Sequence, residues 1–232
     1  MMFSAGRQSL GSLLQRQYTT DKRGGSSKKY MARQRRDPFV KQAVAENYRS
    51  RSSYKLVELL TKYPLLPSKQ SQLCVVDCGA APGGWSQVVA RRLALGAGSE
   101  RAVAVDLLPM QGVPGVRFIE GDFLAEATKQ QMGQALGGRA VGLVLSDMAP
   151  SFTGHRSVDA LRTMALCEDV VDFAEETLAG GGNMVLKFFM GGGEAELRTR
   201  LRGMFAKVKI DKPLASRKES AEQYLVCLGR KM

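Results

Sequence analysis

Short apolar runs that alternate with helical segments constrain the fold of this chain more than any other feature. The runs, rich in Val, Leu and Ile, predict strands at 73–78, 102–106, 116–119, 141–146 and 183–188. Segments with apolar residues at helical spacing follow most of them, at 84–95, 124–135 and 158–178. Strands that alternate with helices predict a mainly parallel sheet covered by helices on both faces. We therefore expect one α/β, Rossmann-like domain.

Further helices and strands are predicted before and after the alternating segments at 73–188. Asp37 and Pro38 are residue types that favour a helix cap and a first helical position, so a helix is expected to begin near Pro38. A second predicted helix, at 51–63, carries Lys55 beside its apolar face. Three later segments complete the pattern, a helix at 194–205 and strands at 207–211 and 223–228. We assign residues 38–232 to the domain.

Residues 1–18 predict a mitochondrial transit peptide. They contain Arg7 and Arg16 and no acidic residue, and Ser, Gln and Leu dominate. The "RQY" before Thr19 is similar to a mitochondrial processing site, which predicts a mature protein in the matrix; an ordinary disordered tail is the alternative. Residues 19–37 are basic and rich in Gly and Ser, so we expect them to be disordered until they bind a partner. No apolar run of about 18 residues predicts a transmembrane helix.

The net charge of +12 is concentrated at the two ends of the chain. Residues 1–62 contain 14 Lys and Arg against 4 Asp and Glu, and residues 196–232 contain 10 against 4. Residues 63–195 contain 10 against 14. Two basic ends around a mildly acidic middle indicate a polyanionic partner, and nucleic acid is the common one. An anionic membrane surface is the alternative that charge alone leaves open.

A glycine-rich turn follows the first strand of the block, in "VVDCGAAPGGWSQVV" at 75–89. In doubly wound sheets, ligands bind beyond the carboxyl ends of the strands, and this turn lies there. Its small residues would let backbone N–H groups approach a ligand closely. Asp106 ends the second strand, where a carboxylate can accept hydrogen bonds from both ribose hydroxyls of a nucleoside. Asp122, after the third strand, is placed to bind an adenine amino group.

The residues of the turn favour one adenosine cofactor over another. Sites for NAD usually carry G-x-G-x-x-G, whose glycines fit a pyrophosphate. This turn reads G-A-A-P-G-G at 79–84, and Pro82 removes one backbone N–H. A cofactor without a pyrophosphate fits better, which indicates S-adenosylmethionine. An NAD-dependent oxidoreductase is the competing class of enzyme, and titration with both cofactors distinguishes the two.

Histidine and cysteine add no further site. The four Cys match no zinc template, so we expect buried thiols and no metal site. His155, the only histidine, lies in a loop where nothing fixes its side chain. A general base near neutral pH must therefore be Lys, Asp, Glu, Tyr or Cys.

Two charged residues are expected together at the ligand-binding edge of the sheet. Asp147 ends the fourth strand, in "LVLSDMAP", and Lys187 lies near the end of the fifth, in "MVLKFF". Lysine is seldom buried in an apolar strand unless it is paired, and Asp147 can be its partner. A structural salt bridge is the plain alternative. In the functional interpretation, Lys187 orients an alcohol and accepts its proton as a methyl group is transferred.

Several stretches together resemble the FtsJ-type ribosomal RNA 2′-O-ribose methyltransferases, in their mitochondrial large-subunit branch. The matching stretches are "RSRSSYKL", "VVDCGAAPGGWSQV", "GDF", "SDMAPSFTG", "VLKFFMGGG" and "KPLASRKESAEQYLV". The resemblance implies the Rossmann-like fold of S-adenosylmethionine-dependent methyltransferases. It also implies 2′-O-methylation of a uridine in mitochondrial large-subunit rRNA, with rRNA as the partner, and we expect the enzyme to be a monomer.

The resemblance further implies which residues form the site. A Lys-Asp-Lys-Glu catalytic tetrad maps onto Lys55, Asp147, Lys187 and Glu222, with Lys187 as the proton acceptor. The cofactor would be held by Pro82, Gly83, Gly84, Trp85, Asp106, Asp122 and Asp147. Basic residues at Arg49, Arg51, Lys55 and in "RKES" would bind RNA phosphates. The target ribose would leave its stack to reach the methyl group.

Two other functions stay open at this point. The tetrad also permits 2′-O-methylation of tRNA or of an mRNA cap. A noncatalytic ribosome-assembly factor could retain the fold, although the complete tetrad argues against that function. Mapping the 2′-O-methyl groups of organellar rRNA with and without the protein separates these possibilities.

Overall fold

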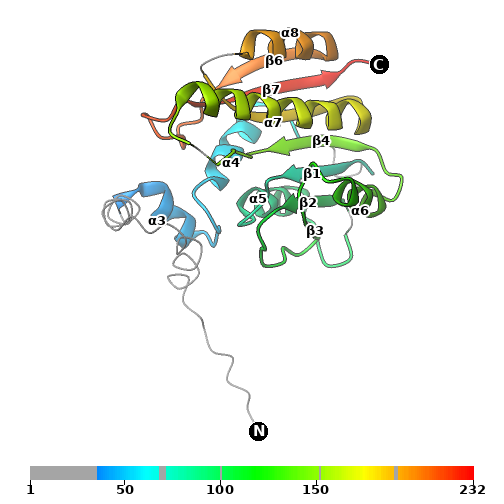
Figure 1. The fold of residues 1–232 in the computed structure, drawn as a ribbon. Helices are drawn as coiled ribbons and strands as arrows, with labels where there is room; N and C mark the ends of the chain where they lie inside the picture. The colour runs from blue at the N-terminus through cyan, green and yellow to red at the C-terminus, as the bar shows by residue number, and fades with distance from the viewer. Residues whose placement is uncertain (1–35, 68–71, 100, 152, 191–192) are drawn as a thin grey trace. The chain divides into compact units, whose positions relative to one another are not determined.

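The strands expected from the apolar runs lie in one sheet of seven strands (Figure 1). The arrangement comes from a computed structural model that describes residues 36–67, 72–99, 101–151, 153–190 and 193–232. The strands are β1 (Cys74–Cys78), β2 (Ala102–Asp106), β3 (Val116–Glu120), β4 (Val141–Ser146), β5 (Leu178–Phe189), β6 (Phe205–Asp211) and β7 (Glu222–Arg230). Their order is β3-β2-β1-β4-β5-β7-β6. The first five pair in parallel and β7 is antiparallel to both β5 and β6, so the mainly parallel α/β sheet is confirmed.

Helices accompany the sheet over the part of the chain that the structure describes. They are α3 (Pro38–Ala45), α4 (Ser53–Lys62), α5 (Gly84–Leu93), α6 (Glu126–Leu136), α7 (Arg156–Thr177) and α8 (Glu194–Met204). Asp37 caps α3 as predicted, because its Oδ1 accepts the Phe39 backbone N–H at 3.0 Å. Helix α5 begins directly after the glycine turn, so its first turn lies at the carboxyl end of β1.

The largest departure from the predicted elements is the start of β5. The strand begins at Leu178, not at Asn183, and continues through the glycines at 180–182. Glycine runs usually mark loops. Here Leu178 pairs with Val141 of β4, and the register shifts before the pair Leu143–Asn183. Pairing with a neighbouring strand, which local sequence does not report, therefore extends the element.

The apolar core lies on both faces of the sheet because successive strand residues point to opposite sides. Val76, Val144 and Leu186 belong to one buried cluster, together with side chains of α6, α7 and α8. The neighbouring residues Val75, Leu145 and Val185 belong to a second cluster with α4 and α5. Polar residues that continue the second set toward the strand ends are thereby directed to the side of α4 and α5.

The chain divides into two compact units, Met1–Lys41 and Gln42–Met232. The second unit contains the sheet and α4 to α8. The predicted transit peptide at 1–18 and nearly all of the predicted basic extension at 19–37 lie outside the described residues. Among the helices that the structure describes, none is long and apolar enough to cross a membrane.

Candidate active site

The carboxyl edge of the sheet collects charged residues from several elements. The strand order reverses between β1 and β4, which is where ligands bind in sheets of this kind. Asp147 follows the last residue of β4, and Lys187 lies near the end of β5. Because β7 is antiparallel, it begins at this edge, with Glu222 opposite Phe189. Lys55 reaches the same place from the first turn of α4.

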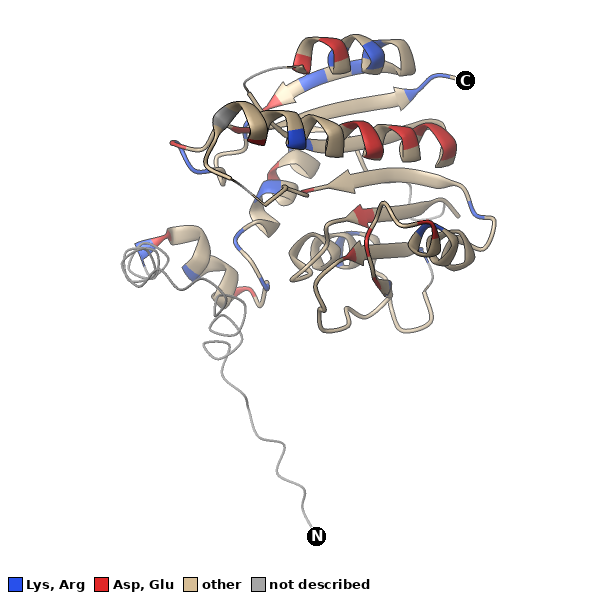
Figure 2. Ribbon diagram, viewed as in Figure 1, with Lys and Arg blue, Asp and Glu red and all other residues tan. Residues whose placement is uncertain are grey.

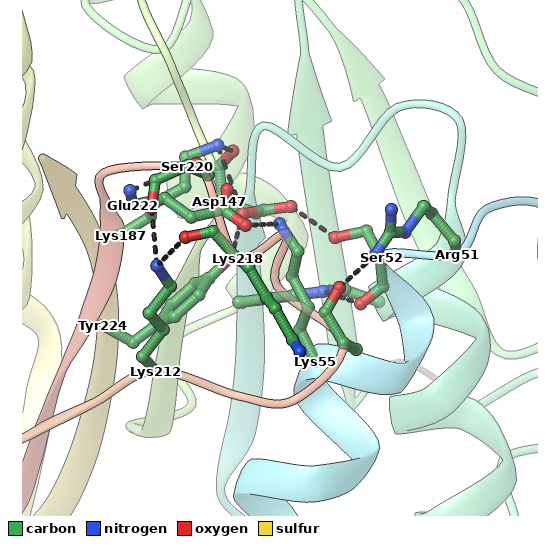
Figure 3. Close-up of polar contacts among 12 residues, drawn as sticks. Arg51, Ser52, Lys55, Asp147, Lys187, Lys212, Lys218, Ser220, Glu222 and Tyr224 are labelled. Carbon is green, nitrogen blue, oxygen red and sulfur yellow. Dashed lines mark hydrogen bonds and ion pairs between the residues drawn. The ribbon is translucent and has the colours of Figure 1, made fainter. Parts of the chain in front are cut away.

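Lys187 and Asp147 form the first of two ion pairs (Figure 3). Nζ of Lys187 lies 3.2 Å from Oδ1 of Asp147 and donates to the Asp147 carbonyl oxygen at 2.5 Å. The two side chains are 9% and 19% exposed. Alternation along β5 places Lys187 on the same side as Val185, the side of α4 and α5. The pairing predicted from the apolar strand is therefore confirmed.

Lys55 and Glu222 form the second ion pair. Nζ of Lys55 lies 2.8 Å from Oε1 of Glu222, and both side chains are 11% exposed. Tyr224 connects the two pairs: its hydroxyl donates to Oδ1 of Asp147 at 2.7 Å, and its ring centroid lies 5.7 Å from Nζ of Lys55. The structure thus brings together all four residues that the family resemblance implied, as two nearly buried pairs of opposite charge.

Two hydroxyl groups hold the Asp147 carboxylate, and neither was expected from the sequence. Ser52 Oγ donates to Oδ2 at 2.5 Å, and Tyr224 donates to Oδ1. A sequence signal existed for the second, because Tyr224 is two residues after Glu222 on one strand and therefore shares its face. Burial also raises the pKa of Tyr224 well above its usual value, so the phenol keeps the proton that it donates.

These contacts determine the protonation state of Asp147. Burial alone raises the pKa of this carboxyl group. The positive charges of Lys187 and Lys55 and the hydroxyl hydrogen bonds outweigh burial and lower the pKa below its usual value. Asp147 is therefore an anion at neutral pH, and it needs the lysines beside it to be stable there.

The backbone of the glycine turn is hydrogen-bonded within the protein itself. The N–H groups of Gly79 and Ala80 donate to the Val105 carbonyl oxygen at 2.9 and 3.1 Å. Ala81 donates to Oδ2 of Asp106, and Gly83 donates to the Ala80 carbonyl oxygen at 2.7 Å. The N–H groups of Gly79, Ala80, Ala81 and Gly83 therefore already have acceptors within the protein. A helix leaves its first N–H groups without an intrahelical acceptor, so the first turn of α5 can offer N–H donors to a ligand at this edge.

The glycines leave room for side chains of the chain's own neighbouring segments. A Cβ at Gly84 would lie 2.4 Å from Ser50 Oγ and 2.7 Å from Ser53 Oγ. A Cβ at Gly79 would lie 2.3 Å from Cγ of Met148. Trp85 reinforces the same packing, since its Nε1 donates to the Ser52 carbonyl oxygen at 2.9 Å and its side chain is buried. The Trp85 side chain therefore joins α5 to α4.

Asp106 and Asp122 lie where the sequence predicts them, at the last residue of β2 and after β3. Oδ1 of Asp106 accepts the Leu108 N–H at 2.8 Å and Oδ2 accepts the Ala81 N–H at 2.8 Å. A carboxylate has about four lone-pair positions, so each oxygen can still accept one ribose hydroxyl. Asp122 is exposed, and its Oδ1 accepts the Leu124 N–H at 3.0 Å.

Asp77 adds a buried acid that fits a cationic cofactor group. Its Oδ2 accepts a hydrogen bond from Ser86 Oγ at 2.7 Å, and the Ser86 backbone N–H also interacts with the carboxylate. The buried Oδ1 has no hydrogen bond of normal geometry in the described part of the chain. Burial raises the pKa of Asp77 to about 7, and the nearby carboxylates of Asp147 and Asp106 add to this effect. The amino-acid end of S-adenosylmethionine carries an ammonium group, which is the kind of donor that the orphaned oxygen requires. The residues of this edge therefore fit that cofactor.

Arg49 and Arg51 were expected to bind phosphates, but their guanidinium groups bind backbone carbonyls. Arg49 donates to the carbonyl oxygens of Pro82, Gln111 and Gly112. Arg51 donates to the Ala215 carbonyl oxygen. These contacts use three of the five guanidinium donors of Arg49, and the contact to Ala215 uses one of those of Arg51. The expectation therefore needs correction, because both side chains have an internal partner.

The loop between β6 and β7 passes over α4 beside the tetrad. The Leu214 N–H donates to Oε2 of Glu58 at 2.7 Å, one helical turn from Lys55. Lys212 folds the loop, since its Nζ donates to the carbonyl oxygens of Lys218 and Ser220 at 3.1 and 2.6 Å (Figure 3). Charged side chains on this loop are consequently held close to the ion pairs.

The remaining predicted features contribute no side chain to the ion pairs, although Cys167 Sγ donates to the Lys187 carbonyl oxygen at 3.3 Å. His155 is exposed and precedes the first residue of α7. The four Cys are buried and free. Burial raises the pKa of the Cys227 thiol above its usual value, which is the behaviour of an inert core thiol.

Comparison with known proteins gives the site a context. A model of the FtsJ-like methyltransferase family matches residues 48–230. Ribosomal RNA large subunit methyltransferase E of Rhodopseudomonas palustris (strain HaA2) is 46% identical over 218 residues, which cover 92% of this chain and 91% of the relative. The protein of the same name from Bradyrhizobium sp. (strain BTAi1) is 46% identical over 211 residues, which cover 91% and 90%. Both relatives are bacterial, so the mitochondrial branch stays a prediction.

A solved structure agrees with the fold. A crystal structure of a Plasmodium falciparum protein described as a ribosomal RNA methyltransferase is similar, with a TM-score of 0.68 and 29% sequence identity. The match covers 79% of this chain and 98% of the other. The Rossmann-like arrangement of strands and helices is therefore shared with that protein.

Proposed function

Because the chain belongs to the FtsJ-like methyltransferase family, we propose that it methylates a ribose 2′-hydroxyl of large-subunit ribosomal RNA. The observation that carries the proposal is the pair of adjacent ion pairs, Lys187–Asp147 and Lys55–Glu222, at the carboxyl edge of the sheet. The names of the bacterial relatives support the choice of substrate. A complete tetrad with every polar group in place favours catalysis over a role in ribosome assembly alone.

S-adenosylmethionine would supply an electrophilic methyl group on a sulfonium centre. Asp106 and Asp122 would accept hydrogen bonds from its ribose and adenine. The amino-acid end would lie beside Asp77 and the first turn of α5, and Asp147 would border both this end and Lys187. The chain's main task is then to place a ribose hydroxyl in line with the methyl group.

Lys187 has the geometry of a proton acceptor. The Lys187 ammonium ion of the resting ion pair therefore has to release one proton to solvent before transfer. The neutral amine then has two N–H groups and one lone pair. Two acceptors surround Nζ of Lys187, the carbonyl oxygen and Oδ1 of Asp147. These acceptors can take both N–H groups, which leaves the lone pair for the 2′-hydroxyl proton. When the ribose oxygen forms its bond to the methyl carbon, the carbon–sulfur bond would break and the sulfonium would leave as a neutral thioether. The hydroxyl proton would move to Nζ of Lys187, and the resulting ammonium ion would be stabilised by the Asp147 carboxylate.

The second ion pair keeps the site polar without adding net charge. Lys55 and Glu222 neutralise each other, so the four charges sum to zero. Nζ of Lys55 is a donor beside the Tyr224 ring and can orient the ribose before transfer. Tyr224 itself holds the Asp147 carboxylate. The hydroxyl, Lys187 and Asp147 would thus keep one fixed arrangement.

The distribution of charge supports an RNA substrate. Figure 2 shows acidic residues along the C-terminal half of α7, residues of both charges on α8 and basic residues on β6. Lys207 and Lys209 of β6 and Lys212 and Lys218 of the following loop are exposed. Phosphates are attracted to this basic strip, which continues to the tetrad, and are repelled from the acidic end of α7.

We extend the proposal to a uridine of mitochondrial large-subunit rRNA and to a monomeric enzyme in the matrix. The acid-free start with Arg7 and Arg16 supports import. One chain supplies the whole tetrad, which supports a monomer. N-terminal sequencing should find a mature protein that begins near Thr19 in organelles. An intact Met1 in the cytosolic fraction would rule out import.

The test of function is a map of ribose methylation in cells that lack the protein. One 2′-O-methyl group in the large-subunit rRNA should disappear, and wild-type protein should restore it. A Lys187→Ala variant at equal abundance should not. Loss of a methyl group from tRNA or from mRNA caps would identify the other substrates. Restoration by Lys187→Ala would show that the protein acts without catalysis.

A further inference from the structure

Arg49 is attached to both sides of the proposed cofactor site. Its Nη1 donates to the Pro82 carbonyl oxygen at 3.1 Å and to the Gln111 carbonyl oxygen at 2.6 Å. Its Nη2 donates to the Gly112 carbonyl oxygen at 2.7 Å. Its backbone N–H donates to Oε1 of Gln87 in α5 at 2.8 Å. One residue therefore connects the glycine turn, helix α5 and the segment that follows β2.

The glycine turn is shaped around this side chain. A Cβ at Gly83 would lie 2.5 Å from Nη1 of Arg49 and 3.2 Å from Sδ of Met110. Gly83 also has a φ of +105°, a backbone conformation that residues other than glycine rarely adopt. Both the lack of space for a Cβ and the positive φ therefore require glycine at residue 83, where the Arg49 guanidinium lies against the turn.

The segment at 107–113, which we call the post-β2 loop, depends on this contact. It contains no helix or strand, and it exposes Leu107 and Leu108 at 67% and 61%. At its start, Leu108 is held by Asp106, and at its end Val113 is buried. Between these points the carbonyl groups of residues 111 and 112 bind Arg49. The loop begins directly after Asp106, the residue that would bind the cofactor ribose, so its position affects that end of the site.

We propose that Arg49 is a positioning residue for the cofactor, which clamps the post-β2 loop to the glycine turn. The inference rests on the proposed function, because it assumes that an adenosine cofactor lies between these two segments. Arg49 touches no reacting atom and acts through the carbonyl groups that it holds. Burial lowers the pKa of Arg49 somewhat, yet a guanidinium held by three carbonyl oxygens remains a cation.

Lysine cannot perform this function. A guanidinium presents its donors in a planar fork, and here two of its nitrogens serve three carbonyl oxygens. A lysine ammonium has a single nitrogen, so it cannot occupy the positions of both Nη1 and Nη2, and it would lose the Nη2 contact to Gly112 even if it kept those of Nη1. A role in binding RNA phosphate, by contrast, depends mainly on charge, so lysine would largely preserve it.

The experiment compares Arg49→Ala and Arg49→Lys with Arg92→Ala, which removes one exposed charge from α5. S-adenosylhomocysteine affinity is measured by calorimetry, and RNA affinity is measured at several salt concentrations. Both Arg49 variants should bind S-adenosylhomocysteine roughly tenfold to a hundredfold more weakly, the effect of losing hydrogen bonds to a charged group. Arg92→Ala should bind it normally. Turnover of Arg49→Ala at saturating cofactor should approach that of wild type, because the reacting atoms keep their neighbours.

Three results would overturn the clamp. Arg49→Ala could bind S-adenosylhomocysteine like wild type. Arg49→Lys could retain cofactor affinity. The salt dependence of RNA binding by Arg49→Ala could fall by about 0.9 in slope relative to Arg92→Ala, which would indicate that Arg49 neutralises a phosphate.

Hydrogen exchange in the cofactor-free protein separates this inference from the proposed function. The amides of 107–113 should exchange faster in Arg49→Ala than in Arg92→Ala. Equal exchange would overturn the clamp whatever the protein binds. Faster exchange in a protein whose wild type binds no S-adenosylhomocysteine would instead overturn the proposed function and leave the clamp in place.

Discussion

At the scale of single residues, the structure makes Lys187 more than half of a salt bridge. Buried ion pairs often contribute little net stability, because desolvation offsets the attraction between the charges. Two acceptors from one residue, Asp147, surround Nζ of Lys187, and two hydroxyl groups hold the Asp147 carboxylate in return. These hydrogen bonds restrict the direction in which the lone pair on Nζ of a neutral Lys187 points. This restriction matters for proton transfer and would be unnecessary for a purely structural pair.

Substitutions at Lys187 separate these two roles. Lys187→Ala should lower the single-turnover rate of methyl transfer to rRNA by roughly 10²–10⁴-fold, the range for a lost acid–base group. Lys187→Arg should fail nearly as badly, because guanidinium keeps the charge but does not give up a proton near neutral pH. Cofactor titration and a thermal melt of each variant serve as controls. Transfer by Lys187→Arg at close to the wild-type rate would leave Lys187 as a positioning charge.

Asp77 should make the cofactor-free protein less stable as the pH rises. Its pKa is about 7 in the folded state, raised by burial, and about 3.8 when unfolded. The folded state therefore binds the proton more tightly, so stability is lost as pH rises from about 4 to about 7. Between pH 5 and 8 the free energy of unfolding of wild type should fall by about 3 kcal/mol relative to Asp77→Asn. Denaturant titrations of both proteins measure this difference. Parallel pH profiles would mean that the Asp77 pKa is not raised.

At the scale of elements, the glycine turn joins α4 to α5. Oγ atoms of Ser50 and Ser53 occupy the space beside Gly84, and the Trp85 indole binds the carbonyl group of Ser52. The first turn of α4 carries Lys55, and the first turn of α5 faces the proposed cofactor site. Close packing between these two helix starts therefore sets the distance between the tetrad and that site.

Gly84→Ala tests this packing. The new Cβ would lie 2.4 Å from Ser50 Oγ, so we expect a loss of about 1–3 kcal/mol in unfolding free energy from overpacking. Gly96→Ala is the matched control, because no atom lies within 4 Å of its added Cβ. Adding Ser53→Ala to Gly84→Ala should restore part of the stability. Equal unfolding midpoints for the two single alanine variants would contradict tight packing at Gly84.

At the scale of the whole molecule, the proposed reaction centre has no net charge, whereas the excess of positive charge lies toward the two ends of the chain. The tetrad sums to zero, and the middle of the chain is mildly acidic. The excess of positive charge lies toward the two ends, and on the C-terminal side it includes exposed lysines of β6 and the loop that follows. A neutral reaction centre beside a basic surface suits an enzyme whose cofactor and RNA substrate carry opposite charges.

The basic extension should contribute to RNA binding through its charge. Deleting residues 19–35 removes six Lys and Arg and one Asp but keeps the Asp37 cap of α3. The slope of log affinity against log salt should become shallower by about 0.9 for each phosphate that the shortened protein no longer neutralises, as fewer counterions are released. Affinity for S-adenosylhomocysteine should not change. Filter binding at several salt concentrations measures the slope, and an unchanged slope would leave the extension as a linker.

Much of the fold was predictable from sequence because its signals are local. Apolar strands and helical periodicity depend on residues within a few positions of one another, and they predicted a mainly parallel α/β sheet. The strand ends also predicted that Asp147 and Lys187 would share one edge, since parallel strands end on the same side. Lys55 and Glu222 needed the family motif, because nothing in their local pattern distinguishes them from ordinary charged residues.

Only the tertiary structure decided how the site is held. Ser52 and Tyr224 bind Asp147 across 95 and 77 residues of sequence, and Arg49 reaches Gln111 across 62. Residue type alone suggested that Arg49 and Arg51 bind phosphate and that the glycines make room for a ligand. Packing instead gives each arginine an internal carbonyl partner and fills the space beside Gly79, Gly83 and Gly84 with protein atoms. A sequence determines which donors and small residues are available, but contacts between distant segments determine which of them face inward, because only the folded chain fixes those distances.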